Sequence, residues 1–188
     1  MHFLKAFLND PGAIGAISPS SQVLALAMVD DLDLQPGCGV LELGPGTGAF
    51  TAEIRSRLTS PDDYVGVERD PGFARVLRER FPDLRIVNGL AEDIGDYYER
   101  NALSPPKAIL CGLPLSIQRR DSLDSIVAVA DELMSAGSEF RTFFYLPALP
   151  LPPAIYFRRR MNAVFGEHRP GRVVMRNLPP ATVLAWRR

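Results

Sequence analysis

The stretch VLELGPGTGAFTAEI, residues 40–54, constrains the fold more than any other part of this sequence. A mostly apolar strand pattern runs into three glycines within five positions, and a helical pattern follows directly. A buried strand that passes through a glycine turn into a helix is the first half of a βαβ unit. Such units build parallel sheets, so this stretch predicts an α/β fold.

The chain downstream repeats this alternation of strand and helix. Apolar runs rich in Val and Ile predict strands at 40–43, 64–67, 84–87, 108–111 and 142–146. Helical patterns lie between and before them, at about 20–31, 48–58, 71–80, 92–100 and 119–135. Strands separated by helices predict a mostly parallel sheet that is covered on both faces.

The pattern changes after Leu146. The closely spaced prolines of LPALPLPPAIYFRRR predict a loop or lid up to about Ala154, followed by a short helix. The last residues, GRVVMRNLPPATVLAW, show two strand-like runs around residues 177–180, which predicts a closing antiparallel hairpin. We therefore expect a Rossmann-like, mostly parallel seven-stranded sheet with a C-terminal antiparallel hairpin.

Length and charge limit the organisation and the partners. A chain of 188 residues, 46% of them hydrophobic, is expected to form a single domain over residues 1–188. The formal net charge of −1 hides an asymmetry, because residues 157–188 contain eight arginines and one glutamate. This basic end predicts an anionic partner or an acidic neighbour within the fold.

Two cysteines and the absence of long apolar runs indicate the cellular compartment. Cys38 and Cys111 fall in or beside predicted buried strands, so we expect core thiols and neither a disulfide framework nor a metal site. No run of about 18 apolar residues occurs, and the N-terminus lacks the order of a secretory signal. The expected location is the cytoplasm, with at most a peripheral attachment to the inner membrane face.

The glycine turn is a candidate ligand site. Gly44, Gly46 and Gly48 lack side chains, so a ligand can reach backbone N–H groups where the helix begins. Gly44, Gly46 and Ala49 also satisfy the dinucleotide fingerprint, and a tight turn without any ligand is a further alternative.

Acidic residues around the turn narrow the choice of ligand. Glu42 precedes the first glycine by two residues, where a carboxylate repels a pyrophosphate but suits an ammonium group. Glu68 ends the next strand and is placed to accept hydrogen bonds from two ribose hydroxyls. Glu92 or Asp93 follows the third strand and would accept from an adenine amino group, although both also suit a helix cap. Together they indicate an adenosine with a charged amino-acid tail.

These segments resemble class I S-adenosylmethionine-dependent methyltransferases over nearly the whole chain. The matching motifs are ELGPGTG, VGVERD, GLAEDI and AILCGLPLS. Within that superfamily, GAIGAISPSS, CGLPLS and RNLPPATVLAWRR resemble the bacterial phospholipid N-methyltransferases, which methylate phosphatidylethanolamine toward phosphatidylcholine. The resemblance implies S-adenosylmethionine as cofactor, S-adenosylhomocysteine as product, a phospholipid substrate and no nucleic-acid partner. It implies cofactor contacts from the motif residues Glu42, Gly44, Gly46, Thr47, Gly48, Glu68, Arg69, Ala91, Glu92, Asp93 and Gly112.

Ribosomal RNA adenine dimethylases are the main alternative within the superfamily, because the chain also resembles them. Their fourth-strand motif is Asn-Leu-Pro-Tyr, whereas residues 112–115 here read Gly-Leu-Pro-Leu. The amide that meets a base amino group and the aromatic ring that stacks on a flipped base are both missing. We also expect no separate RNA-binding domain after the sheet. A non-catalytic module that binds adenosine or lipid is the second alternative class.

The substrate side is predicted from the ends of the fourth and fifth strands. Leu113, Pro114 and Leu115 would form an apolar wall beside the transferred methyl group, and such a wall lowers the pKa of a substrate ammonium. Tyr145 and Tyr156 flank the proline-rich loop and offer aromatic faces to a methylated ammonium, although either ring also suits the core. The candidates for the lipid head group, in the terminal motif, are Arg176 on its phosphate and Asn177 beside it.

Residues 1–17 form the predicted membrane contact. Phe3, Leu4, Phe7 and Leu8 share one helical face, which would lie in a membrane interface or close the active site. The arginines at 158–160 favour anionic head groups near the same edge.

Overall fold

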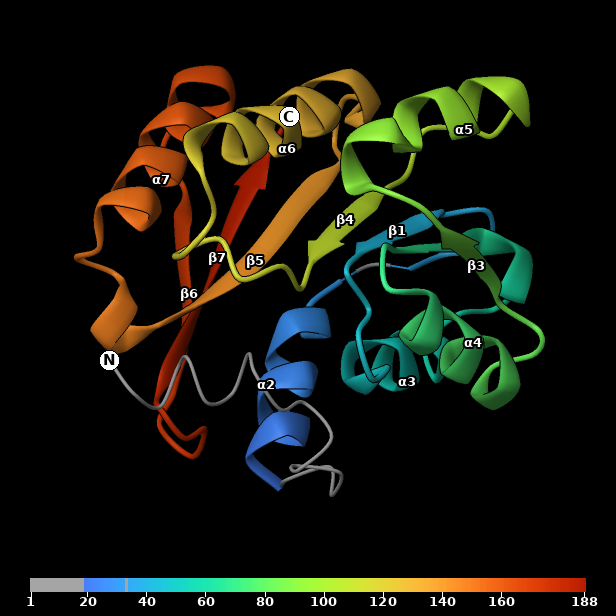
Figure 1. Ribbon diagram of the computed structural model, residues 1–188, viewed down its shortest axis with the longest axis horizontal. Coiled ribbons are helices and arrows are strands. Elements are labelled where there is room, and N and C mark those ends of the chain that lie inside the picture. Colours follow the sequence, from blue (N-terminus) through green and yellow to red (C-terminus); the bar gives the residue numbers. More distant parts are fainter. Residues whose placement is uncertain (1–18, 33) are drawn as a thin grey trace.

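The computed structural model describes residues 19–32 and 34–188 of the chain (Figure 1). Its helices are α2 (Pro19–Val29), α3 (Ala49–Arg55), α4 (Pro71–Arg80), α5 (Ile94–Arg100), α6 (Arg120–Leu133) and α7 (Pro152–Phe165). Its strands are β1 (Val40–Leu43), β2 (Tyr64–Glu68), β3 (Arg85–Asn88), β4 (Ala108–Cys111), β5 (Glu139–Tyr145), β6 (Arg169–Val174) and β7 (Ala181–Arg187). Three short 3-10 turns lie at Pro61–Asp63, Ala91–Asp93 and Leu146–Ala148.

The seven strands form one sheet with the order β3-β2-β1-β4-β5-β7-β6. Strands β1 to β5 are parallel, and β7 runs antiparallel between β5 and β6. The chain moves outward in one direction from β1 to β3 and in the other from β4 onward. The order therefore reverses between β1 and β4, which is where open α/β sheets bind ligands.

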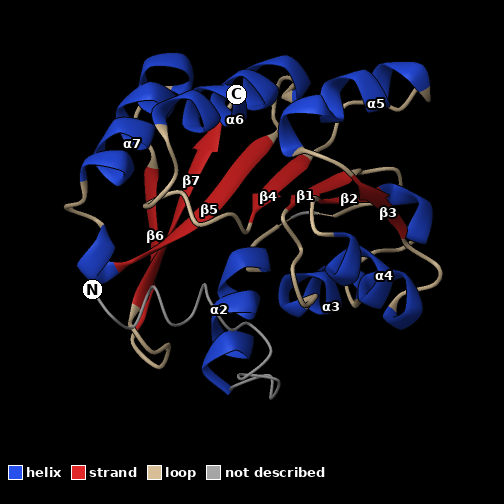
Figure 2. Cartoon of the chain, in the orientation of Figure 1, coloured by secondary structure: helices blue, strands red, loops and turns tan. Residues whose placement is uncertain are grey.

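Helices cover both faces of the sheet (Figure 2). One face carries α2, α3 and α4, whose apolar side chains pack with Val40, Tyr64 and Leu110. The other carries α5, α6 and α7, which pack with Leu41, Ile109 and other strand residues. Because neighbouring strand residues point to opposite faces, strands buried on both sides read as continuous apolar runs. This confirms the predicted fold and the closing hairpin.

The predicted start of the fifth strand is wrong. β5 begins at Glu139 and not at residue 142. The sequence pattern misses its first residues because Glu139 and Arg141 are charged, although both lie almost fully buried in the strand. The Glu139 carboxylate pairs with Arg141, and with Arg169 and Arg187 at 2.6 Å each. Burial acts to raise the pKa of Glu139, but the hydrogen bonds from Arg187 and Arg141 outweigh it and lower the pKa. The basic end of the chain thus meets an acidic neighbour inside the fold.

The proline-rich segment is shorter than predicted. Helix α7 already begins at Pro152, with prolines in its first turn, and runs for 14 residues. Proline fits there because the first helical N–H groups have no partner within the helix. The prolines therefore start this helix instead of delaying it to Ala154.

Candidate functional site

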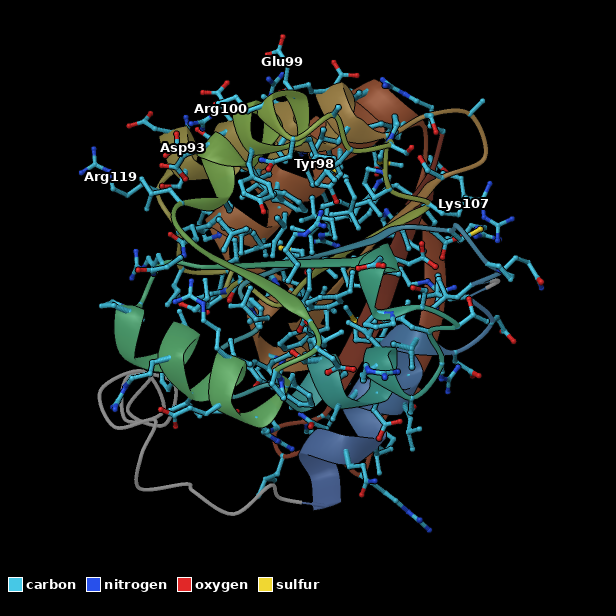
Figure 3. All side chains as sticks on the ribbon, turned by 90° about the vertical axis from the view of Figure 1, so that its right-hand side faces the viewer. Asp93, Tyr98, Glu99, Arg100, Lys107 and Arg119 are labelled. Atoms are coloured by element: carbon cyan, nitrogen blue, oxygen red, sulfur yellow. The ribbon has the colours of Figure 1, made fainter. Side chains whose placement is uncertain are left out.

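The candidate site lies at the edge of the sheet where β1 to β5 end. Asp93 after β3 and Arg119 before α6 stand at this edge, whereas Lys107 before β4 stands at the opposite edge (Figure 3). The glycine turn follows β1 and Gly112 follows β4, so the two segments flank the reversal of strand order. The sequence motifs quoted for the cofactor therefore gather at one edge.

The three glycines of the turn differ in the space that surrounds them. All adopt left-handed conformations, with φ of 73° at Gly44, 56° at Gly46 and 84° at Gly48. A Cβ atom at Gly44 would lie 2.5 Å from the Leu113 side chain, and one at Gly48 would lie 2.8 Å from Phe81. A Cβ atom at Gly46 would meet no atom within 4 Å. Packing excludes side chains at the outer two glycines, and Gly46 alone faces open space.

Glu68 joins the end of β2 to the glycine turn. Its side chain is nearly buried, and its two oxygens accept hydrogen bonds from the backbone N–H groups of Gly46 and Asp70, each at 2.9 Å. A carboxylate has about four acceptor positions, so two remain for a ligand. The Asn88 amide donates to the carbonyl groups of Glu68 and Arg69, which fixes this strand end. Sequence reasoning missed Asn88, whose only signal is a polar residue at the end of a strand.

Glu42 lies beneath α3, fully buried on the face that carries α2 to α4. Its Oε2 atom accepts hydrogen bonds from Thr51 at 2.8 Å and from Tyr64 at 2.6 Å, whereas its buried Oε1 atom has no partner among the described residues. Burial raises the pKa of Glu42 to about 7, against the smaller effect of these two hydrogen bonds. Its contact with a cofactor ammonium stays a prediction. The structure gives it a second role, because it anchors the helix that follows the glycine turn.

The segment after β3 keeps two carboxylates available. Glu92 and Asp93 are exposed and lie in the 3-10 turn that begins at Ala91. Asp93 holds the N-cap position of α5, but its side chain makes no capping hydrogen bond. Leu90 just before them is 45% exposed. The apolar side chain suits contact with the face of an adenine ring, and the free carboxylates suit hydrogen bonds from its amino group.

The segment after β4 packs tightly against the glycine turn. A Cβ atom at Gly112 would lie 2.8 Å from the Gly44 carbonyl oxygen, so only glycine permits this approach. Leu113 is partly exposed and Pro114 is exposed, which leaves both able to line a site. Leu115, however, is 1% exposed and belongs to the core below, so it does not contribute to the expected apolar wall.

Three aromatic rings extend from this point along the site edge. The Phe50 ring lies 3.6 Å from the position of a Gly112 Cβ atom and packs edge-on against Phe143, with ring centroids 5.7 Å apart. Phe143 packs in the same way against Tyr145, at 5.5 Å. All three rings are partly exposed, and burial raises the pKa of the Tyr145 phenol, which therefore stays neutral. The sequence analysis missed Phe50 and Phe143, although residues 143 and 145 share a face in any strand.

Tyr156 and two of the three neighbouring arginines are engaged by other parts of the chain. The Tyr156 hydroxyl donates to Asp124 of α6 at 2.8 Å, and the Arg120 guanidinium lies over its ring. Arg160 pairs with the same carboxylate at 2.8 Å. Arg158 donates to the Leu149 carbonyl group. These contacts fasten α7 to α6 and to the segment that precedes α7.

Arg176 and Asn177 lie in the turn between β6 and β7. Asn177 is buried and donates to the Pro179 carbonyl group at 2.7 Å, so it shapes the turn. Arg176 is exposed and makes no ion pair with any residue that the structure describes. Its guanidinium is therefore free for an anionic group.

Residues 1–17, the predicted membrane contact, lie outside the described part of the chain. Within the described residues, no group of three or more His, Cys, Asp or Glu side chains is placed to hold a metal ion. Both cysteines are free thiols, with Cys111 buried and Cys38 partly exposed. Among the described helices, none is both long and apolar enough to cross a bilayer.

The residues at this edge fit an adenosine cofactor. Glu68 presents free acceptor positions to hydroxyls, and no side chain covers the backbone at Gly46. Asp93 lies at the same edge, after the strand that is second from β1. Thr47, next to Gly46, and Arg69, next to Glu68, are both exposed. Gly112 packs against the glycine turn at Gly44.

Comparison with known proteins agrees with this geometry. Residues 20–94 match the family model described as ribosomal RNA adenine dimethylase. The chain is 29% identical to an ornithine lipid N-methyltransferase of Singulisphaera acidiphila, over 95% of this chain and 91% of that protein. It is 32% identical to ribosomal RNA small subunit methyltransferase A of Chlorobium phaeobacteroides, over 48% of this chain and 32% of that protein. An O-methyltransferase from Bacillus cereus, solved in complex with S-adenosylhomocysteine, superposes with a TM-score of 0.67 at 15% identity, covering 98% of this chain and 88% of that one.

The chain has the class I S-adenosylmethionine-dependent methyltransferase fold, and its relatives in sequence are methyltransferases. The match to the ribosomal RNA family ends at residue 94, after β3 and before β4. The match to the Chlorobium protein covers about a third of that protein's length. The similarity to the ornithine lipid enzyme, in contrast, covers almost all of both chains.

Proposed function

We propose that this methyltransferase acts on the amine of a membrane lipid, converting phosphatidylethanolamine to its mono- and dimethyl forms and toward phosphatidylcholine. The extent of the similarities carries the proposal. The relative that acts by name on a lipid aligns with 95% of the chain, which includes strands beyond β3. The match to the ribosomal RNA family covers only residues 20–94, which hold the glycine turn and Glu68.

The segment after β4 favours an amine over a nucleic-acid base. Residues 112–115 carry neither the amide nor the aromatic ring of the Asn-Leu-Pro-Tyr motif in RNA adenine dimethylases. Leu113 and Pro114 instead present apolar surface next to the glycine turn. An apolar wall disfavours the charged ammonium, so it lowers the pKa of the lipid amine and raises the fraction with a free lone pair.

The aromatic row of Phe50, Phe143 and Tyr145 suits the products of successive methylation. Each methyl group removes an N–H donor, and the final quaternary ammonium has none. Aromatic faces attract such a cation without hydrogen bonds. Tyr145, at the end of β5, would be the first ring of the row to meet the head group, and its neutral hydroxyl offers an acceptor to the unmethylated amine.

S-adenosylmethionine, when bound, supplies a methyl group on a positively charged sulfur. The proposed role of this chain is mainly to align that group with the amine, since alignment contributes much of the rate in a displacement of this kind. Glu68 would hold the ribose, Asp93 or Glu92 the adenine amino group, and the backbone around Gly46 the amino-acid tail. Gly112 and Leu113 would separate the cofactor from the lipid.

Arg176 would distinguish between two lipid head groups. A guanidinium can bind two oxygens of a phosphate at once. Phosphatidylethanolamine carries a phosphate, whereas an ornithine head group offers an amine without one. Because Arg176 has no partner among the described residues, it is available for this contact. It favours phosphatidylethanolamine, and an ornithine lipid is the second substrate to test.

We also propose a peripheral location on the cytoplasmic membrane face. Arg159, unlike Arg158 and Arg160, is exposed without a partner in the described chain and would meet anionic head groups. Residues 1–17 would add their apolar face to this contact.

Transfer of radiolabelled methyl groups tests the proposed function. The full chain is incubated with labelled S-adenosylmethionine and vesicles that contain phosphatidylethanolamine, an ornithine lipid or neither, and separately with structured ribosomal RNA. Label in methylated phosphatidylethanolamine, reduced in Glu68→Ala, supports the proposal. Label in RNA alone would establish the RNA alternative. Cofactor binding without any transfer would establish a binding module.

A further inference from the structure

The turn between β6 and β7 carries two strongly exposed apolar side chains. Leu178 is 77% exposed and Met175 is 68% exposed, and these are the highest values among the large apolar side chains of the described residues. Val173, just before the turn on β6, is 48% exposed. Arg176 lies between Met175 and Leu178 and is exposed as well.

The turn holds these side chains outward by its own construction. The buried Asn177 donates through its side chain to the Pro179 carbonyl group and through its backbone N–H to Val174. On the inner side, Val174 packs in the apolar cluster that contains residues of α2. The side chains at 175 and 178 are therefore kept out of the core, and they lie close together on the surface of one short turn.

The turn stands at the edge of the sheet where the candidate site lies. Because β7 is antiparallel, its first residue, Ala181, pairs with the last residue of β5, Tyr145. The hydrogen bond from the Leu146 N–H to the Pro180 carbonyl group, at 2.8 Å, extends this pairing. Residues 175–179 thus project past the end of β5, next to the aromatic row. Two other exposed apolar residues, Leu90 and Ile117, follow β3 and β4 at this edge.

We propose that the β6–β7 turn inserts into the interface of an anionic lipid bilayer and sets the site edge against the membrane. Met175 and Leu178 would enter the boundary of head groups and acyl chains, and Arg176 would stay at the level of the phosphates. The combination of two apolar tips with one cation between them matches such an interface. This inference rests on the proposed function, because a lipid amine must reach the site while its acyl chains stay in the bilayer.

Vesicle binding tests the turn independently of catalysis. Vesicles of phosphatidylcholine and phosphatidylglycerol, without any phosphatidylethanolamine, are sedimented with the full chain and with the double variant Met175→Asp/Leu178→Asp. A control, Val76→Asp/Val164→Asp, adds the same charge at exposed apolar positions of α4 and α7. We expect the turn variant to bind at least about tenfold more weakly than the control, since two apolar side chains lose their burial. Equal binding of the two double variants would overturn the inference.

A tryptophan at the tip reports insertion directly. Trp186 is buried at the far end of β7, so acyl chains do not reach it. In vesicles with brominated acyl chains we expect fluorescence quenching for Leu178→Trp and none for the native chain or Val164→Trp. No quenching of Leu178→Trp would contradict insertion.

Turnover separates this inference from the proposed function. With phosphatidylethanolamine dispersed in detergent, the turn variant should methylate the lipid as fast as the native chain. With phosphatidylethanolamine in vesicles, its rate of methylation should fall by about the same factor as its vesicle binding. Quenching and weaker vesicle binding without any lipid methylation would support the membrane contact and overturn the proposed function. Lipid methylation together with equal vesicle binding by both double variants would support the proposed function and overturn the membrane contact.

Discussion

Replacing Glu42 with glutamine should remove a pH dependence from the stability of the fold. Burial raises the pKa of this carboxyl from 4.5 to about 7. The folded protein therefore binds a proton more tightly than the unfolded chain. The contribution of Glu42 to stability is fully present below pH 4.5 and is lost as the pH rises through 7. A shift of this size corresponds to about 3 kcal/mol, at 1.36 kcal/mol for each pKa unit.

Glutamine keeps the shape of the side chain and cannot ionise. As the pH rises from about 5 to about 8.5, the native chain should therefore lose about 3 kcal/mol in its free energy of unfolding relative to Glu42→Gln. Urea unfolding followed by the fluorescence of the single tryptophan, Trp186, measures it. Glu79→Gln, at a side chain 66% exposed, is the control and should show no such change. Parallel pH profiles for the native chain and Glu42→Gln would refute the reasoning.

Substitutions at three residues test the site. Glu68→Ala should weaken binding of S-adenosylhomocysteine by about 1 to 3 kcal/mol in calorimetry, because the ribose loses a charged acceptor, and unchanged affinity would make Glu68 purely structural. Tyr145→Phe should keep most of the turnover of dimethylated lipid whereas Tyr145→Ala loses it, since the ring attracts the cation; equal rates would exclude this contact. Arg176→Ala should reduce kcat/KM for phosphatidylethanolamine by about 1.5 to 3 kcal/mol without changing cofactor affinity, and Arg176→Lys should recover only part. A native rate in both would make Arg176 a surface residue.

The fold was predictable because local patterns determine its elements. The strands at 40–43 and 108–111 and the helix at 71–80 agree with the structure residue for residue. The Asp70 side chain caps that helix by accepting from the Phe73 N–H group. The start of β5 was not predictable in this way. In the sequence Glu139 and Arg141 look like solvent-exposed residues. Only the fold brings Arg169 and Arg187 to Glu139, and the Met28 and Asp30 carbonyl groups to Arg141.

The candidate site was predictable where its residues follow a motif. The glycines, Glu68 and Gly112 meet at one edge because the carboxyl ends of parallel strands do so. The burial of Glu42 depends on Thr51 and Tyr64, and the aromatic row on contacts between α3 and β5. Side-chain packing between distant segments leaves no periodic signal in the sequence.

Lipid composition in a living cell tests the central claim most directly. The chain is produced in a bacterial host that makes phosphatidylethanolamine but none of its methylated forms, and the extracted lipids are separated and identified. We predict monomethyl and dimethyl phosphatidylethanolamine or phosphatidylcholine with the native chain, and less of them with Glu68→Ala. Unchanged phosphatidylethanolamine in cells that contain the folded native protein would contradict the account.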